Sequence, residues 1–290
     1  MNPRINIIGC GRAAGSLARL WTEAGSAGIG DVMNRTEASS REAVRKIGSG
    51  HVAGSISDMR PADYWLIGSN DDQIIHVANR LAEDMEKLSG SLVFHLAGRF
   101  GLEVLEPLAR GNVLLAALHP VRSLTDTRIP LEAFKSTACV AEGTAEALAA
   151  LKPLITGIGG NWLPVAAIDR GLYHASVSII SNITKAVAWK AQKWQVRAGL
   201  PEETAATVTH QLLQSTMEDL FRSGARQTIT GPVVRGDTST IAAHIEAVRS
   251  THPEDVDVYR VLARTVLELA QERGDLDQST LLRFENLLND

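Results

Sequence analysis

Short apolar runs alternate with longer stretches of helical periodicity through the first half of the chain. Such runs, bounded by glycine and small polar residues, are typical of buried strands. The predicted strands cover residues 5–8, 30–35, 51–53, 63–69, 92–96, 113–118, 136–141 and 157–164. The predicted helices between them cover residues 15–20, 38–47, 73–88, 102–110 and 148–155. Because strands separated by helices usually lie parallel, this pattern predicts an α/β domain with a doubly wound parallel sheet.

The pattern changes after Pro164, where helical spacing continues without another strand-like run. The predicted helices cover residues 169–199, 201–223, 238–250, 255–273 and 278–288, with a loop at 227–237. We therefore expect two domains, the α/β domain over residues 1–164 and an all-helical domain over residues 165–290. Ligands are expected between them, at the carboxyl ends of the parallel strands.

The first predicted strand leads directly into a G-x-G-x-x-A pattern at residues 9–14, which is followed by a helix. Gly9 would permit the tight turn, and Gly11 would let a pyrophosphate approach the backbone. Ala14 or Gly15 would let the helix pack close to the sheet, and the helix N-terminus would attract the anion. This arrangement predicts a Rossmann dinucleotide-binding domain. The simpler alternative is a tight turn that binds no ligand.

The end of the second predicted strand indicates which dinucleotide is bound. NAD sites usually carry an acidic residue about 20 residues past the glycines, where it bonds the ribose 2′-hydroxyl. Here the segment reads Asn34-Arg35-Thr36, without a carboxylate. A guanidinium suits a phosphate, and Arg12 could add a second cation, so the sequence favours NADP over NAD. The alternative for Arg35 is an exposed surface arginine.

The predicted cofactor site also includes the polar turn where the fourth predicted strand ends. This edge of the sheet is where a dinucleotide lies. The complete predicted set is Gly9, Gly11, Arg12, Ala14, Asn34, Arg35, Thr36, Ser69 and Asn70.

A polar stripe runs along the helix predicted after Asp169, and its residues share one face at helical spacing. The stripe consists of His174, Ser178, Ser181, Asn182 and Lys185. His174 could donate a proton to a carbonyl under reduction, Asn182 could orient the substrate, and Lys185 could bind a carboxylate. The alternatives are hydrogen bonds between helices and a dimer interface.

His119 directly follows a predicted buried strand, at the edge where ligands lie. The predicted catalytic residues are therefore His119, His174 and Asn182. His95 lies at the end of its own strand and could also face the nicotinamide, whereas His244 is expected in a core or an interface. The histidines show no metal-binding spacing, so no metal is expected.

Composition excludes several classes of protein. The 290 residues are 44% hydrophobic and 21% charged, with a net charge of -4, which is typical of a globular protein without a nucleic-acid-binding face. Two cysteines are too few for a disulfide framework. No apolar run approaches the roughly 20 residues that span a bilayer, and no signal peptide is evident. We expect a cytoplasmic protein that binds neither nucleic acid nor membrane.

Several segments together resemble one bacterial family. They are residues 7–12, 94–98, 118–123, 169–175, 181–182, 230–237 and 259–262. The chain is similar to Rossmann-like proteins with a C-terminal helical domain of unknown function. That family is related to deazaflavin-dependent NADP oxidoreductases, pyrroline-5-carboxylate reductase and the 6-phosphogluconate dehydrogenase superfamily. The resemblance implies a homodimer built on the C-terminal helices, but no particular substrate. The chain departs from the family pattern at Asn70, Ala97 and Leu124, and Ala97 weakens the case for a catalytic hydroxyl there.

The sequence therefore favours an NADP-dependent oxidoreductase that moves a hydride between nicotinamide and a small carbonyl, imine or alcohol. A non-catalytic dinucleotide sensor or scaffold is the first alternative, because no unmistakable acid and base pair is evident. A methyltransferase is the second, because a glycine-rich turn can also hold S-adenosylmethionine. The helical second domain and Arg35 argue against it.

Overall fold

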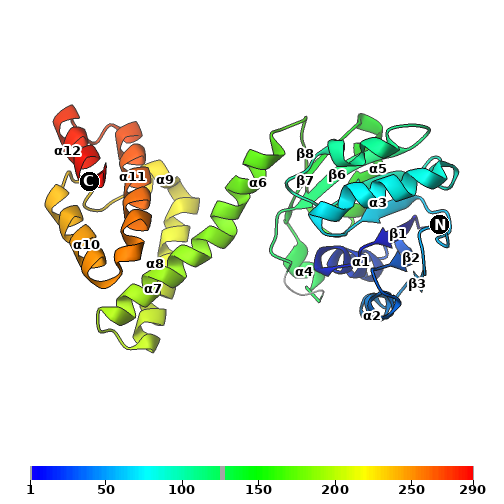
Figure 1. The fold of residues 1–290 in the computed structure, drawn as a ribbon, viewed down its shortest axis with the longest axis horizontal. Coiled ribbons are helices and arrows are strands. Elements are labelled where there is room, and N and C mark those ends of the chain that lie inside the picture. Colours follow the sequence, from blue (N-terminus) through cyan, green and yellow to red (C-terminus); the bar gives the residue numbers. More distant parts are fainter. Residues whose placement is uncertain (1, 125–127, 290) are drawn as a thin grey trace. The chain divides into compact units, whose positions relative to one another are not determined.

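The computed structural model describes residues 2–124 and 128–289, which fold as two compact units (Figure 1). The first extends as far as Asn182, and the second begins at Ile183. The helix after the last strand, which was expected to open the second domain, therefore groups with the sheet. Its side chains explain this grouping, because Arg170 and Tyr173 bond residues of the sheet strands.

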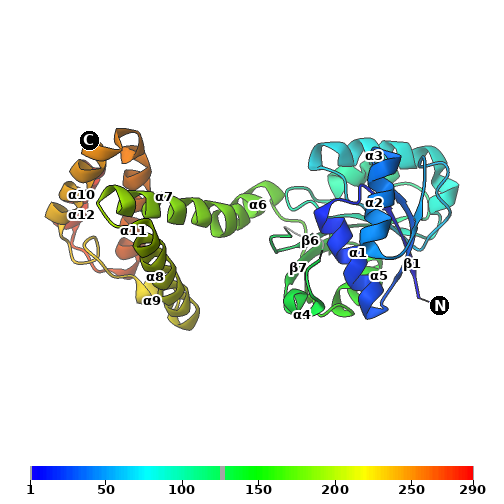
Figure 2. The same ribbon diagram turned by 90° about the horizontal axis from the view of Figure 1, so that it is seen from below.

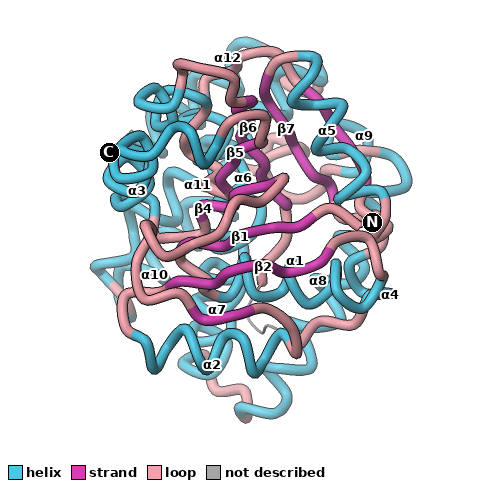
Figure 3. The backbone as a smooth tube through the Cα atoms, turned by 90° about the vertical axis from the view of Figure 1, so that its right-hand side faces the viewer, coloured by secondary structure: helices cyan, strands magenta, loops and turns pink. Residues whose placement is uncertain are grey.

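The described residues of the first unit form one sheet with the strand order β3-β2-β1-β4-β5-β6-β7-β8 (Figure 3). The strands are β1 (Arg4–Ile8), β2 (Gly28–Met33), β3 (His51–Val52), β4 (Tyr64–Ile67), β5 (Leu92–His95), β6 (Leu114–Pro120), β7 (Ala138–Gly143) and β8 (Asn161–Pro164). The pairs are parallel except for β6 with β7, which is antiparallel, so the expectation of a fully parallel sheet is corrected there. A parallel crossover usually needs a full helix. Between these two strands, the described residues form only the short helix α4 (Leu131–Phe134).

Apolar side chains of the sheet alternate between two cores, because successive residues of a strand point to opposite faces. Leu66 and Phe94 pack on one face with helices α1 (Arg12–Ala24) and α5 (Ala145–Thr156). Trp65 and Val93 pack on the other face with helix α3 (Ile74–Leu81). The sheet is thus covered on both faces, as a doubly wound fold requires.

Several predicted elements differ in detail. The helix predicted over residues 73–88 consists of the 3₁₀ turn η1 (Asp71–Gln73), α3 and the 3₁₀ segment η2 (Ala82–Leu88). The helix predicted over 102–110 is the 3₁₀ segment η3 (Leu102–Leu108), which contains Pro107 and so lacks one N–H donor. Helix α2 (Glu37–Ile47) was predicted almost to its bounds.

The helix predicted over residues 169–199 contains three segments. Helix α6 (Arg170–Ser178) is followed by the π-helical segment η4 (Ile179–Ile183) and by α7 (Thr184–Arg197). A π-helical insertion shifts the register of the helix and often occurs at functional sites.

The described residues of the second unit form helices and the loops that join them (Figure 2). After α7 come α8 (Glu202–Ser223), α9 (Ala225–Thr228), α10 (Thr238–Thr251), the 3₁₀ turn η5 (Pro253–Asp255), α11 (Val256–Arg273) and α12 (Gln278–Asn289). Its core lies between α10, α11 and α12, and Val233 from the preceding loop packs into it. Val233 therefore fixes the loop predicted over residues 227–237 to this core. Among the described residues, no helix has the length and apolar character to cross a membrane.

Candidate functional site

The turn between β1 and α1 approaches the end of β4 so closely that three small residues are required. Gly9 has φ +82°, and a Cβ there would lie 2.4 Å from the Ser69 nitrogen. A Cβ on Gly68 would lie 2.6 Å from both the Ala14 Cβ and the Gly9 oxygen. Ala14 is buried, so its side chain packs the helix against the sheet rather than touching a ligand.

Gly11 differs from these residues because the space beside it is open. A Cβ there would meet only the Gly68 oxygen, at 3.9 Å. Gly11 is the N-cap of α1, without a side-chain hydrogen bond, and the first turn carries no acidic residue. The first N–H groups of a helix lack partners within it, so this end of α1 is suited to an anion.

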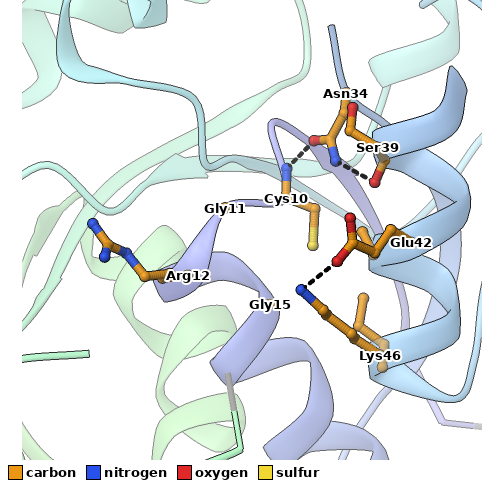
Figure 4. Close-up of a pocket in the computed structure, with 10 residues that line it drawn as sticks. Cys10, Gly11, Arg12, Gly15, Asn34, Ser39, Glu42 and Lys46 are labelled. Atoms are coloured by element: carbon orange, nitrogen blue, oxygen red, sulfur yellow. Dashed lines mark hydrogen bonds and ion pairs between the residues drawn. The ribbon is translucent and has the colours of Figure 1, made fainter. Parts of the chain in front are cut away.

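A cavity of about 240 Å³ lies beside this turn (Figure 4). It is lined by Cys10, Gly11, Arg12, Gly15, Asn34, Ser39, Glu42, Ala43, Lys46 and Ile47. Two of the predicted anion-binding residues, Gly11 and Arg12, therefore share one cavity. Burial raises the pKa of Cys10 to about 12, so its sulfur remains a thiol at neutral pH.

Asn34 and Thr36 are committed to bonds within the protein. The Asn34 Oδ1 accepts from the Cys10 nitrogen at 2.6 Å, and Nδ2 donates to the Ser39 oxygen at 3.0 Å (Figure 4). Thr36 is the N-cap of α2 and accepts from the Ser39 nitrogen at 3.2 Å. These contacts hold the loop after β2 against the glycine turn. Arg35 is exposed, and the described residues offer its side chain no hydrogen-bond or ion-pair partner.

The end of β4 brings a further polar group to the glycine turn. The Ser69 Oγ is buried and has no hydrogen-bond partner among the described residues. An unsatisfied buried hydroxyl is unfavourable unless a ligand or water completes it. Asn70 is exposed and immediately precedes η1.

A second cavity, of about 380 Å³, lies at the end of β6. It is lined by His119, Val121, Arg122, Ser123, His174, Val177, Ser178, Ile180, Ser181 and Asn182. It thus contains all three residues predicted to be catalytic, and four of the five in the polar stripe. Lys185, the fifth, lies beyond the boundary of the first unit.

His119 is held by a side chain that the sequence prediction did not include. Its Nδ1 lies 2.8 Å from the Tyr173 hydroxyl, and its ring centroid lies 5.9 Å from that of His174. Burial, and then the charges of His174 and Arg170, lower the pKa of His119 to about 4. Burial raises the pKa of Tyr173, so at neutral pH the pair consists of a protonated phenol and a neutral imidazole. When Nε2 carries the ring proton, the phenol donates to Nδ1.

Gly98 lets both histidines approach the loop after β5. A Cβ there would lie 2.8 Å from the His119 Cε1 and 2.8 Å from the His174 Cδ2. A side chain at this position would displace both rings. The one sequence signal for Gly98 was its place in a segment that resembles the family.

A buried ion pair anchors the start of α6. The Arg170 Nε donates to the Glu142 Oε2 of β7 at 2.9 Å, and the Arg170 side chain is buried, whereas that of Glu142 is 12% exposed. Asp169 caps the helix by accepting from the Leu172 nitrogen at 2.9 Å. Tyr173 and His174 follow within one turn, so the ion pair positions them. Nothing in the local sequence relates Arg170 to a residue 28 positions earlier.

His95 and His244 do not join the cavity. His95 is fully buried, with its Nε2 donating to the Gly101 oxygen at 2.8 Å and its Nδ1 accepting from the Ala97 nitrogen at 3.2 Å. Both ring nitrogens are therefore used, which corrects the suggestion that His95 could face the nicotinamide. His244 is exposed and bonds Tyr259 at 2.7 Å, so it is not a core residue.

Two family models match the chain in succession. Residues 2–120 match the Rossmann-like domain, and residues 137–266 match a domain of unknown function, DUF2520. The chain therefore consists of a Rossmann-like domain followed by a DUF2520 domain, as the resemblance implied. A comparison with curated proteins gives no match.

Solved structures share the fold over nearly the whole chain. Protein TM1727 from Thermotoga maritima has a TM-score of 0.71 and 22% identity, covering 92% of this chain and 98% of that one. An imine reductase from Myxococcus stipitatus in complex with NADP+ has a TM-score of 0.62 and 18% identity, covering 98% and 100%. A pyrroline-5-carboxylate reductase from Coxiella burnetii has a TM-score of 0.59 and 17% identity, covering 99% of each chain. At these identities the likeness establishes a common fold.

We predict that His119 titrates with a pKa of about 4 in an NMR pH titration, against an ordinary value of 6.5. Between these values the unfolded chain binds more protons, so this group makes the free energy of unfolding rise with pH from about 4 to 6.5 and level off above. The His119→Gln variant should show a smaller slope, with His95 still contributing in the same direction. Titration of His119 near 6.5 would contradict this description.

Proposed function

We propose that the protein is an NADP-dependent oxidoreductase acting on a small carbonyl, imine or alcohol. One observation carries the proposal: the open glycine turn at β1 and the cavity that His119 and His174 line at the end of β6 lie at the same edge of one sheet. Three strand spacings separate β1 from β6, or about 14 Å, which an extended dinucleotide can span. The named functions of structures with the same fold, including an NADP+ complex, are consistent with it.

The residues at the glycine turn fit a dinucleotide. Gly11 and the first N–H groups of α1 would bind the pyrophosphate, with Arg12 as a nearby cation. Arg35, which has no described partner, would bind the 2′-phosphate. The Ser69 hydroxyl would gain the partner that it lacks. Asn34 supports the site indirectly by fixing the loop that carries Arg35.

The residues at the second cavity would supply orientation and a proton. When bound, NADPH supplies a hydride, and reduction of a carbonyl or imine also requires one proton at its oxygen or nitrogen. Tyr173 holds a proton at neutral pH, and in the tautomer whose Nδ1 carries the ring proton His119 donates to the phenol oxygen. The phenol would then give its proton toward the substrate and take the Nδ1 proton, while His119 takes up a proton at Nε2. His174 lies against the same pair, and the Asn182 amide lines the cavity where it can orient the substrate.

One observation favours a non-catalytic sensor as a second candidate. The pKa of His119 is lowered to about 4, so its imidazole is not a proton donor in the charged form at neutral pH. A sensor would bind NADPH without consuming it. Measuring NADPH turnover separates the oxidoreductase from the sensor, because both candidates predict that the cofactor binds.

We predict that Arg35→Gln weakens NADPH binding by about 10- to 100-fold, because a charge-assisted bond to the 2′-phosphate is lost. NADH binding should change little, because NADH lacks that phosphate. Isothermal titration calorimetry would measure both. The control is Arg45→Gln, which removes an equally exposed cation from the same region, in α2. Equal weakening of NADPH and NADH, or an equal effect of the control, would overturn the role of Arg35.

We predict that Tyr173→Phe lowers kcat for NADPH oxidation by about 10²- to 10⁴-fold, the usual range for loss of a proton-transfer group. NADPH affinity should persist, because Tyr173 contacts His119 at the end of β6 and not the glycine turn. Tyr64→Phe is the matched control, since its hydroxyl bonds the Ala150 oxygen away from both cavities. Unchanged turnover and pH profile in Tyr173→Phe would remove Tyr173 from the chemistry.

We also propose that the helices after the sheet form a homodimer. Helix α7 contains no buried residue, and α8 buries only Ala205. Trp189 on α7 is 58% exposed and Phe221 on α8 is 81% exposed, and other large apolar side chains on these two helices are exposed too. Apolar surface of this extent usually marks an interaction site. A second copy presents the same helices, so a two-fold interface would cover both sets at once.

Sedimentation equilibrium tests the dimer. We predict twice the mass of one chain for the wild type and a shift toward one chain for Leu212→Glu on α8, where Leu212 is 63% exposed. Gln211→Glu adds the same charge at the neighbouring exposed position and should leave the dimer intact. A monomeric wild type at micromolar concentration would contradict the proposal.

A further inference from the structure

The cavity at the end of β6 has an unequal distribution of charge. Its ten lining residues include Arg122, four hydroxyl or amide side chains and two histidines, but no carboxylate. At neutral pH His119 is uncharged, because burial lowers its pKa to about 4. Arg122 is the one arginine or lysine among these ten lining residues. The cavity beside the glycine turn differs, because its Lys46 is already paired with Glu42 at 2.6 Å.

Arg122 has a fixed backbone and an exposed side chain. Its nitrogen donates to the Pro120 oxygen at 2.9 Å, and the preceding Val121 nitrogen donates to the Ala138 oxygen at 2.7 Å. These bonds hold the backbone at the end of β6. The side chain is exposed and has no ion pair within residues 2–124 and 128–289. The buried Arg170 differs from Arg122, because its guanidinium is paired with the Glu142 carboxylate.

The remaining lining residues limit the rest of the ligand. Val121, Val177 and Ile180 provide apolar surface, and Ser178, Ser181 and Asn182 provide neutral polar groups. A guanidinium binds a carboxylate or a phosphate with two parallel hydrogen bonds. One guanidinium balances the single charge of a carboxylate, whereas a phosphate ester carries about -1.5 to -2 at neutral pH. The balance of charge therefore favours a carboxylate.

We propose that the substrate is a small oxo or imino acid, and that Arg122 binds its carboxylate. The proposal rests on the proposed oxidoreductase function and specifies its substrate class. The carboxylate lies at Arg122, the short carbon chain contacts the apolar residues, and the reacting oxygen or nitrogen faces His119, which Tyr173 contacts. The sequence had assigned carboxylate binding to Lys185, which lies outside the unit that contains this cavity.

Paired substrates with and without a carboxylate test this assignment. The probes are 2-oxopentanoate and 2-pentanone, each alone and with methylamine, which forms the corresponding imines. NADPH oxidation by the full-length protein should favour 2-oxopentanoate. Arg122→Gln should lower kcat/KM for that acid by about 10- to 100-fold, mainly through KM, and leave 2-pentanone nearly unchanged. Arg122→Lys, which keeps the charge, should recover part of the loss. Arg80→Gln removes an exposed cation from α3 and should have no effect.

A binding measurement keeps the test decisive if no compound is reduced. Phenylglyoxal modifies accessible arginines, and peptide mass spectrometry reports Arg122 individually. With NADP+ present, 2-oxopentanoate should protect Arg122 at concentrations where 2-pentanone does not. Glyceraldehyde 3-phosphate and inorganic phosphate serve as phosphate probes. Arg80 should be modified equally throughout.

The outcomes separate this inference from the proposed function. Turnover without a carboxylate preference, or with a preference that Arg122→Gln does not change, overturns the inference and leaves the oxidoreductase standing. Protection without turnover supports the carboxylate site and counts against catalysis. Protection by the phosphate probes alone, or by none, shows that Arg122 does not select a carboxylate.

Discussion

Close approach of chain segments at the carboxyl edge of the sheet, possible only at glycines, is the constraint on which both cavities depend. The β1–α1 turn lies against the end of β4 only because Gly9 and Gly68 lack side chains. The loop after β5 lies against His119 and His174 only because Gly98 also lacks a side chain. A few tenths of an ångström matter here, because packed interiors tolerate little added volume. The edge is therefore compact where the chain contacts itself and open at Gly11, where a ligand is expected.

The ion pair between Arg170 and Glu142 has a comparable role for the second cavity. Removing two charges from water is unfavourable, and such a pair seldom adds net stability over apolar residues. It does fix the start of α6 on β7 in one position, because an alternative packing would leave a buried charge unpaired. Tyr173 is thereby held beside His119. The π-helical segment that follows brings Ser181 and Asn182 to the same cavity.

The order of strands and helices could be predicted because it depends on local patterns. Apolar runs and the glycine turn identified the sheet, the first βα unit and the change to helices after residue 164. The antiparallel pairing of β7 with β6 was missed, although no helix was predicted between residues 118 and 136 and a parallel crossover usually needs one. Parts of two predicted helices proved to be 3₁₀ segments, since periodicity hardly separates the two forms.

The residues of the candidate site could be predicted where their place on a strand end or a helix face was enough to select them. His119, His174 and Asn182 were selected by their positions on a strand end and a helix face, and they line one cavity. Tyr173, Gly98 and the Arg170–Glu142 pair were missed, because each acts through a partner far away in the sequence. Asn34 was selected for contact with a ligand, but its amide binds Cys10 and Ser39 instead. Sequence position locates a residue at an edge, but only packing decides what it binds there.

The central claim is that the glycine turn holds NADP. Calorimetric titration of the wild type and of Gly11→Ala with NADPH, NADH and S-adenosylmethionine tests it most directly. The space beside Gly11 is open, so a methyl group there meets no close neighbour while obstructing a bound pyrophosphate, and the loss of stability is limited to the poorer N-cap that alanine gives α1. We predict tightest binding of NADPH by the wild type and a loss of at least tenfold in Gly11→Ala, with a Tm only a few degrees lower. Tighter binding of S-adenosylmethionine, or NADPH binding that Gly11→Ala does not alter, would contradict the account.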